Sequence, residues 1–216
     1  MKQATATFDF DDDAPLLAVE NAVVKYSTSG GDLTAVDGIS FSVSENEIFG
    51  LVGESGCGKS TVAQAVLSLL PSNGRIDSGS VRFRGVELTE LSKRELDALR
   101  WEHFSLISQG AMNALNPVHR ISDQIVEAIQ AHRDADTNEA RERVAELFEV
   151  VGLDPDRMDD YPHQFSGGMK QRAYIAMSLA LDPDLIIADE PTTALDVIVQ
   201  DQILKRLKEL RDDLGI

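Results

Sequence analysis

The sequence of 216 residues contains a single cysteine, Cys57. One cysteine excludes an internal disulfide, which agrees with a reducing compartment such as the cytosol. No apolar run approaches the ~20 residues of a membrane-spanning helix. Residues 1–13 also lack the apolar core of a signal peptide. We therefore expect a chain without a membrane anchor of its own, so any association with a membrane must come through a partner.

Basic residues are also scarce, with 20 Lys and Arg against 37 Asp and Glu and a net charge of −17. Such a charge repels nucleic-acid backbones, so we expect no nucleic-acid partner. One interpretation is an ordinary, well-solvated acidic surface. Another is a protein from a high-salt cytoplasm, because Asp outnumbers Glu and Arg outnumbers Lys. The apolar content of 43% is ample for one large domain or for a core with an inserted subdomain.

The most informative stretch is residues 53–61, GESGCGKST, which we call the phosphate loop. It fits the pattern G-x-x-x-x-G-K-[ST], with a strand-like apolar run at residues 48–52 before it and a helical stretch at residues 61–70 after it. Glycines let backbone N–H groups approach an anion, and the helix N-terminus adds partial positive charge. Lys59 is expected to reach the outer phosphates, and the Ser60 hydroxyl to ligate Mg²⁺. The alternative is a glycine-rich turn before an ordinary helix.

Two carboxylates, Asp189 and Glu190, follow a fully apolar run at residues 185–188 that is typical of a buried parallel strand. Ligand sites of open α/β sheets lie at this end of the strands. We expect Asp189 to hold Mg²⁺ through its water shell and Glu190, which faces differently, to polarise an attacking water. Taken alone, the pair could equally be a solvated strand end. Its occurrence together with the phosphate loop favours the metal and base roles.

The pattern of apolar and polar residues outside these motifs predicts the order of the structural elements. Residues 1–15 are polar and acidic, which predicts a disordered tail. Strand patterns through about residue 90 predict an antiparallel β layer beside an α/β core. They lie at residues 16–26, 39–43, 81–83 and 86–88, with a loop at 27–32 and a further strand at 104–108. Ser92 and Glu95 form a capping box for a helix. Helical spacing recurs at residues 121–132, 138–151, 166–181 and 197–214, and the first two predict an inserted helical subdomain at about residues 110–165.

Residues 165–172, FSGGMKQR, place a serine and two glycines at a helix start, which makes a second anion site from one hydroxyl and uncovered N–H groups. A chain that binds one nucleotide does not need two such sites. This stretch resembles the signature of ATP-binding cassette (ABC) ATPases, and the resemblance covers nearly the whole chain from Leu16 onward. It implies an α/β P-loop NTPase fold over residues 16–216, with an ABC-type core, an antiparallel β subdomain and an inserted helical subdomain.

The resemblance also implies roles for single residues. Tyr26 matches the aromatic that stacks on adenine, although it could also be a half-buried strand tyrosine. Gln109 matches the glutamine that senses Mg²⁺ and the γ-phosphate, in a catalytic role, and Asp196 ends a loop that communicates across the family's dimer. Ser166, Gly167 and Gly168 are expected to contact the nucleotide that is bound to the second subunit. The nucleotide bound to this chain is expected to contact the phosphate loop: Gly53, Glu54, Ser55, Gly56, Cys57, Gly58, Lys59, Ser60 and Thr61.

The segment Asn113-Ala114-Leu115-Asn116-Pro117 resembles the ATPase subunits of dipeptide, oligopeptide and nickel importers. The resemblance implies a subunit that binds ATP and Mg²⁺, hydrolyses ATP and lies peripherally on the cytoplasmic face of the cell membrane. Its implied partners are integral-membrane permease subunits, an identical or related second ATPase subunit and, indirectly, an extracytoplasmic substrate-binding protein. Dipeptides, longer peptides, nickel and glutathione all remain open as the substrate.

The sequence departs from the family pattern at two places. Asn46 stands where the family usually has glycine, which asparagine can replace because it tolerates positive φ. The family also places a histidine after a further strand, and none of the four histidines lies there. We therefore expect a C-terminally truncated domain that binds MgATP better than it hydrolyses it.

Two other classes of ATP- or GTP-binding protein are alternatives to this interpretation. A soluble ABC ATPase that remodels chromosomes or ribosomes is an alternative, but the span between Gln109 and Ser166 leaves no room for the long coiled coil of the chromosome type. The signature at Ser166 argues against a P-loop kinase or GTPase.

Overall fold

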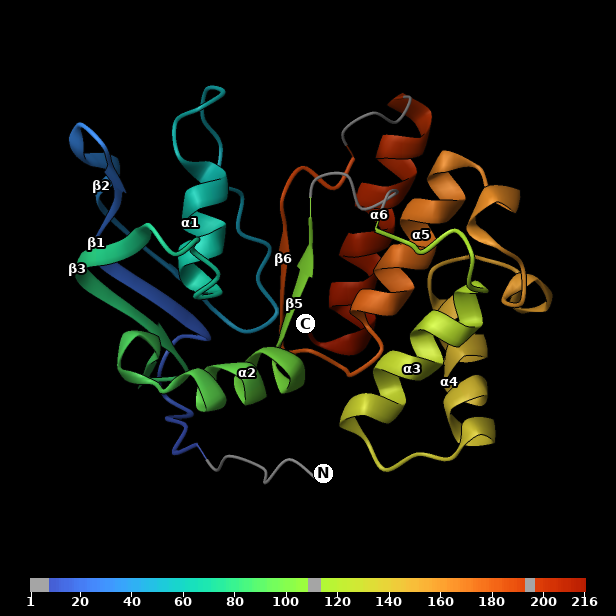
Figure 1. The fold of residues 1–216 in the computed structure, drawn as a ribbon. Coiled ribbons are helices and arrows are strands. Elements are labelled where there is room, and N and C mark those ends of the chain that lie inside the picture. The colour runs from blue at the N-terminus through green and yellow to red at the C-terminus, as the bar shows by residue number, and fades with distance from the viewer. Residues whose placement is uncertain (1–7, 109–113, 193–196) are drawn as a thin grey trace. The chain divides into compact units, whose positions relative to one another are not determined.

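The computed structural model describes residues 8–108, 114–192 and 197–216. The chain divides into two compact units, Met1–Arg100 and Trp101–Ile216, which we call the first and second units. Figure 1 colours their elements along the chain. Among the described residues, no helix has the length and apolar character needed to cross a membrane.

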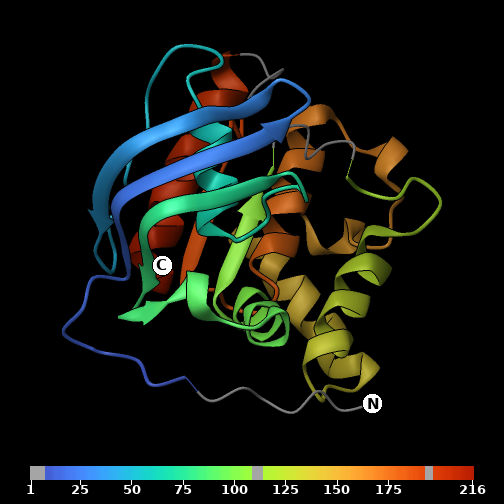
Figure 2. The ribbon, with the colours of Figure 1, turned by 60° about the vertical axis from the view of Figure 1, so that its left-hand side comes forward.

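The first unit is built on a four-stranded antiparallel sheet with the order β2-β1-β3-β4. Its strands are β1 (Leu17–Thr28), β2 (Gly31–Val43), β3 (Gly74–Phe83) and β4 (Val86–Glu87). β1 lies between β2 and β3, as Figure 2 shows. The predicted antiparallel β layer is therefore confirmed. The loop predicted at residues 27–32 is shorter than expected, because β1 continues to Thr28 and β2 begins at Gly31.

Helix α1 (Lys59–Val66) contacts β1, β2 and β3 and buries Val62, Ala65 and Val66. It begins two residues earlier and ends four residues earlier than the predicted stretch at 61–70. After the sheet come the short helix η1 (Leu88–Glu90) and α2 (Lys93–Glu102). The predicted capping box of α2 is confirmed, because Ser92 Oγ accepts the Glu95 N–H at 3.3 Å and Glu95 Oε2 accepts the Ser92 N–H at 2.8 Å.

The strand predicted at residues 48–52 is wrong for this structure, which has no strand there. Ile48 and Val52 are 56% and 93% exposed, and Phe49 stacks on Phe41 of β2 with ring centroids 4.8 Å apart. An apolar run shows a preference for burial, but a strand also needs a neighbouring backbone to complete its ladder of hydrogen bonds. Among the described residues, the four-strand sheet is formed without this run.

The second unit contains a parallel pair of strands, β5 (Phe104–Ile107) and β6 (Leu185–Ala188). Four longer helices accompany the pair: α3 (Ile121–His132), α4 (Thr137–Val150), α5 (Gly167–Ser178) and α6 (Val197–Leu214). Short helices η3 (Pro155–Arg157) and η4 (Pro162–Gln164) join α4 to α5. α3, α6 and β6 have the predicted bounds, and the predicted helix at 166–181 is shortened to α5. The elements described between β5 and α5 are all helical.

One apolar core joins the parallel strands to these helices, and Ile107, Ile125, Phe148, Ile175 and Ile203 are each at most 1% exposed in it. Local signals set the ends of α4. Asp136 and Glu139 form a capping box at its start, and Gly152, with φ of 70°, follows its end.

Part of the predicted tail makes contacts with the first unit. The Phe10 ring packs edge-on against Phe83 of β3 with centroids 5.7 Å apart, and the Asp11 N–H donates to the Arg84 carbonyl oxygen at 2.9 Å. Residues 1–7 lie outside the described residues, and for them the disordered tail stays a prediction.

Candidate functional site

The phosphate loop has a backbone that only glycine adopts easily at several positions. Gly56 and Gly58 have φ of 81° and 97°, in the left-handed region. A Cβ added to Gly58 would lie 2.7 Å from the Ala35 carbonyl oxygen, and one added to Gly53 would lie 2.6 Å from Cys57 Sγ. Glycine is therefore needed at these positions, for positive φ at Gly56 and Gly58 and for close approach at Gly53 and Gly58. Such a backbone suits a cradle for an anion.

Helix α1 begins directly after this loop. Its N-cap is Gly58, so no N-cap side chain takes the N–H groups of the first turn, which also holds no acidic residue. Lys59 Nζ donates to the carbonyl oxygens of Gly53 at 2.9 Å and Glu54 at 2.8 Å, and the ammonium thus lies at the loop. Ser60 is exposed beside it. The N-terminus of α1, the Lys59 ammonium and the exposed Ser60 hydroxyl together suit a bound phosphate and its Mg²⁺.

Tyr26 lies in the same unit as the phosphate loop. It is half-buried on β1, and its hydroxyl donates to Thr61 Oγ1 in the first turn of α1 at 3.4 Å. The structure thus brings the sequence-predicted aromatic to the helix that carries the loop.

The two predicted carboxylates lie at the C-terminal end of β6. The Asp189 N–H donates to the Ile107 carbonyl oxygen at 2.9 Å, which extends the parallel ladder one residue beyond β6. Glu190 follows with φ of 49° and is exposed, whereas Asp189 is half-buried. Their carboxylates therefore differ in environment, as two separate roles require. Within the described ranges, no three His, Cys, Asp or Glu side chains gather in a metal-binding cluster.

The signature stretch forms the start of α5. Ser166 is the N-cap, and its Oγ accepts the Met169 N–H at 3.3 Å. Ser166 and Gly167 are exposed, so the hydroxyl and the helix N-terminus face solvent. Gly168 faces α6, where an added Cβ would lie 2.7 Å from Val199 Cγ1. Gln109 and Asp196, the other predicted site residues of this unit, lie outside the described residues.

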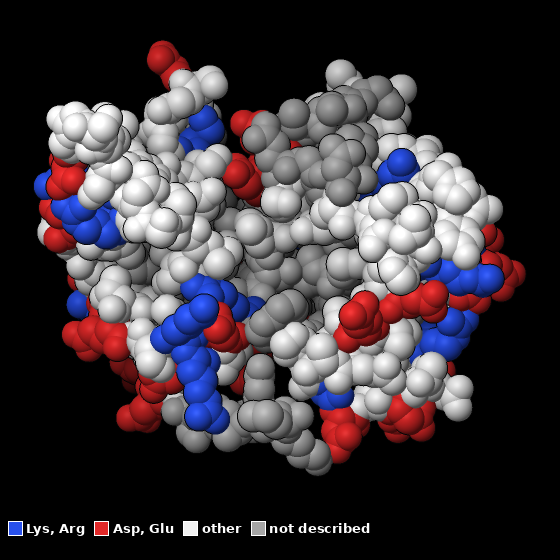
Figure 3. All heavy atoms as spheres, in the orientation of Figure 1, with Lys and Arg blue, Asp and Glu red and all other residues white. Residues whose placement is uncertain are grey.

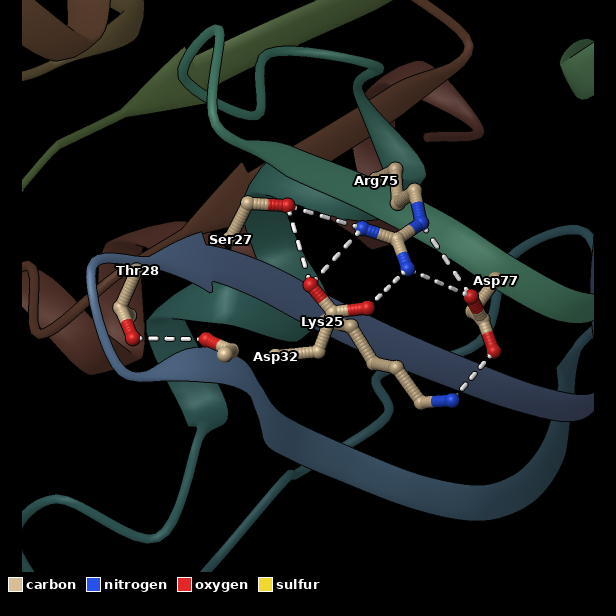
Figure 4. A network of polar contacts seen from close by, with 7 residues as sticks. Lys25, Ser27, Thr28, Asp32, Arg75 and Asp77 are labelled. Carbon is tan, nitrogen blue, oxygen red and sulfur yellow. Dashed lines mark hydrogen bonds and ion pairs between the residues drawn. The ribbon is translucent and has the colours of Figure 1, made fainter.

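A polar network on the residues that flank Tyr26 in β1 was not predicted from the sequence. Arg75 of β3 donates to Ser27 and Asp32 and pairs with Asp77, which also pairs with Lys25 at 2.6 Å (Figure 4). The hydrogen bond from Arg75 holds the pKa of Asp32 below its usual value, and the one from Lys25 does the same to the pKa of Asp77. Arg75 and Ser27 are 48 residues apart in the sequence. They meet only because β1 and β3 pair in this register, which the sequence pattern does not show.

Comparison with known proteins decides the family, because residues 36–193 match the family described as ABC transporter. This chain belongs to the ABC transporter family. It is 45% identical over 199 residues to the dipeptide transport ATP-binding protein DppD of Bacillus subtilis (strain 168), which covers 91% of this chain and 59% of DppD. It is 47% identical over 203 residues to the oligopeptide transport ATP-binding protein OppD of Escherichia coli (strain K12), covering 93% of this chain and 60% of OppD.

Solved structures show the same fold. The ATP-binding cassette MJ0796, in a dimeric post-hydrolysis state bound to ADP and Pi, matches with a TM-score of 0.79 and 26% identity over 92% of this chain and 84% of that one. CbiO1 of Clostridium perfringens, part of the ABC transporter complex cbiONQ, matches with a TM-score of 0.79 and 27% identity over 94% and 76%. The predicted ABC-type α/β fold is confirmed. The chain spans about three fifths of the length of DppD and OppD.

Proposed function

We propose that this chain is the ATP-binding and ATP-hydrolysing part of a subunit that energises an ABC importer for dipeptides or oligopeptides. The observation that carries the proposal is the glycine-shaped phosphate loop, with Lys59 held against it at the start of α1. The names of DppD and OppD support peptides as the transported class. The proposal places the subunit on the cytoplasmic face of the membrane, bound to permease subunits that receive peptide from an extracytoplasmic binding protein.

ATP bound with Mg²⁺ supplies the phosphoryl group that is transferred to water. The loop N–H groups and Lys59 hold the phosphates, and Tyr26 stacks on the adenine. Oxygens of Ser60, Gln109 and Asp189 would hold the Mg²⁺, which would neutralise charge on the phosphates.

Glu190 is the proposed general base. Its exposed carboxylate, at the end of β6, takes the proton of the attacking water. Gln109 orients the same water toward the γ-phosphate.

The signature residues complete the site of a second, identical or related subunit. Ser166 Oγ accepts a hydrogen bond from its own helix, which leaves its O–H available to donate to a phosphate oxygen across the dimer. Gly167 and Gly168 leave the adjacent N–H groups uncovered, and Asp196 communicates between the two sites. ATP favours the closed dimer through its extra contacts there, and closure drives the permease. The dimeric state of MJ0796 is consistent with this arrangement.

Nucleotide binding tests the first step. MgATP affinity is measured by calorimetry for the chain, for Lys59→Ala and for the control Lys208→Ala, which removes the same charge from an exposed site on α6. We expect Lys59→Ala to weaken binding at least about tenfold, because a hydrogen-bonded charge is lost, and Lys208→Ala to leave it unchanged. Equal affinities in all three proteins would contradict the assignment of the loop.

Transport tests the whole function. A chain extended to the length of DppD is reconstituted in vesicles. The vesicles also contain the permease and the binding protein whose genes lie beside the gene for this chain. We expect peptide to stimulate ATP hydrolysis and to enter the vesicles only with ATP. Hydrolysis stimulated by DNA or ribosomes instead of peptide would point to a remodelling ATPase.

A further inference from the structure

β1 and β3 place Tyr26 directly opposite Gly74. A Cβ added to Gly74 would lie 2.7 Å from Cε1 and 3.0 Å from Cδ1 of Tyr26, so the ring fills the space that a side chain would take. Residues opposite each other on antiparallel strands project from the same face of the sheet. An aromatic ring that covers a cross-strand glycine is a recognised way of stabilising glycine within a sheet.

The ring also reaches the helix that carries the phosphate loop. Its hydroxyl donates to Thr61 Oγ1 at 3.4 Å, and the same added Cβ on Gly74 would lie 3.3 Å from the Cβ of Leu70, which follows α1. Tyr26 therefore lies between β3 and the segment around α1. A side chain at position 74 would have to displace the ring, because Leu70 leaves little room for other adjustments.

The network of Figure 4 holds the strands in the register that makes this pair. Lys25 and Ser27 flank Tyr26 on β1, and Arg75 follows Gly74 on β3. Because side chains alternate along a strand, the flanking residues project from the opposite face. The Lys25–Asp77 ion pair and the hydrogen bond from Arg75 to Ser27 join β1 to β3 next to this pair. A register slip would break all of these bonds at once.

We propose that Gly74 is a positioning residue for the base of the bound nucleotide. The missing side chain at position 74 lets the Tyr26 ring lie close on β3, at the height where it stacks on a base whose phosphates occupy the phosphate loop. This inference rests on the proposed binding of ATP and adds a residue that acts on the base through Tyr26. A methyl group at position 74 lifts the ring and removes the stack, while the glycines and Lys59 that shape the phosphate loop are unchanged.

The test compares Gly74→Ala with the control Gly30→Ala, whose added Cβ would meet its nearest neighbour, Thr28 Oγ1, at an ordinary 3.9 Å. Affinities of the full chain are measured for MgATP and for magnesium tripolyphosphate, which has phosphates but no base. We expect Gly74→Ala to weaken MgATP binding about tenfold, the size of one base–aromatic stack, with tripolyphosphate binding unchanged. Gly30→Ala should change neither affinity.

A double-mutant cycle isolates the role of the ring. In a Tyr26→Leu background the added methyl has no stacked ring to displace, so Gly74→Ala should cause no further loss of MgATP affinity. The ring contact is also measured without changing Gly74, because the ring current of Tyr26 shifts the Gly74 α-proton resonances. These resonances should move in Tyr26→Leu. This measurement decides the geometry even if Gly74→Ala does not fold.

Three results would overturn the inference: unchanged MgATP affinity in Gly74→Ala, an equal loss of MgATP and tripolyphosphate, or a loss that persists in the Tyr26→Leu background. Unmoved Gly74 resonances would also overturn it. Failure of the proposed function looks different, because the unchanged protein would then bind neither MgATP nor tripolyphosphate.

Discussion

Glycines in the first unit differ in what a side chain would meet. Gly79 has φ of 88°, and an added Cβ would lie 2.3 Å from the Asn21 carbonyl oxygen, beside the register shift between β1 and β3. Gly38 has φ of 69° but nothing within 4 Å of its added Cβ. Gly30 has neither the positive φ nor a close contact. Alanine would therefore meet both backbone strain and a steric clash at position 79, strain alone at position 38 and neither at position 30.

We expect alanine at these positions to destabilise the protein in the order 79, 38, 30. Gly79→Ala should lower the free energy of unfolding by at least about 2 kcal/mol, because strain and a backbone clash add. Gly38→Ala should lower it by about 1 kcal/mol from strain alone, and Gly30→Ala should change it by less than about 0.5 kcal/mol. Urea unfolding measures all three. Equal effects at positions 79 and 38 would show that the strand shifts to relieve the clash.

Glu190→Gln keeps the size of the proposed base but removes its ability to take a proton. In a chain extended to the length of DppD, we expect hydrolysis to fall at least about 100-fold and ATP-bound dimers to accumulate, as seen by size-exclusion chromatography. Glu142→Gln, on the exposed face of α4, is the matched control. Hydrolysis at the unchanged rate would exclude Glu190 as the base.

At the scale of elements, a polar cluster joins α3, α4 and the turn after η3. Asp159 accepts two hydrogen bonds from Arg141, at 2.9 and 2.7 Å, and one at 2.7 Å from Ser122, which is 0% exposed. The bond from Arg141, followed by that from Ser122, holds the pKa of Asp159 below its usual value. The folded state therefore favours the ionised carboxylate.

Acid should weaken this part of the second unit. Because the folded pKa of Asp159 is depressed, its contribution is present above the unfolded value of about 3.9 and is lost as pH falls through the folded pKa. We expect Asp159→Asn to lower the free energy of unfolding at pH 6 and to reduce its loss between pH 5 and pH 3. Asp156→Asn, at an exposed site on η3, is the control. Chemical denaturation at each pH measures both, and parallel pH profiles for Asp159→Asn and the unchanged protein would contradict the expectation.

The elements that could be predicted are those set by local pattern. The bounds of α3 and α6 follow from apolar residues at helical spacing, and the phosphate loop and the Ser166 signature are contiguous motifs. The strand expected at residues 48–52 failed because strand formation depends on a distant partner. The Tyr26–Gly74 contact could not be predicted for the same reason, since it exists only in one register of β1 and β3.

On the scale of the whole chain, charge is the dominant feature. On the face in Figure 3, groups of Asp and Glu side chains lie beside Lys and Arg side chains. Ion pairs such as Arg133–Asp182 and Lys205–Asp201 occupy some carboxylates, but 37 acidic residues against 20 basic ones leave a net charge of −17. The remaining carboxylates repel one another and oppose the compact state at low ionic strength.

Salt should therefore stabilise the protein. We expect the melting temperature to rise between about 0.05 and 0.5 M KCl, as screening weakens the repulsion. At 1 M the screening length is already about 3 Å, so a further rise in molar KCl would favour adaptation to a high-salt cytoplasm. Equal stability in dilute buffer and in molar KCl would remove that interpretation. Thermal melts at a series of KCl concentrations measure the effect.

The parallel pairing of β5 with β6 also has a consequence for folding during synthesis. His103 and Asp184, just before the two strands, bind each other across 81 residues of chain. At ribosomal rates of about 5–20 residues per second, β5 is synthesised roughly 4–16 s before its partner. During that interval α3 and α4 can form from local contacts, whereas β5 exposes an unpaired apolar edge. A newly made chain that stalls before residue 185 should therefore be a preferred client of chaperones.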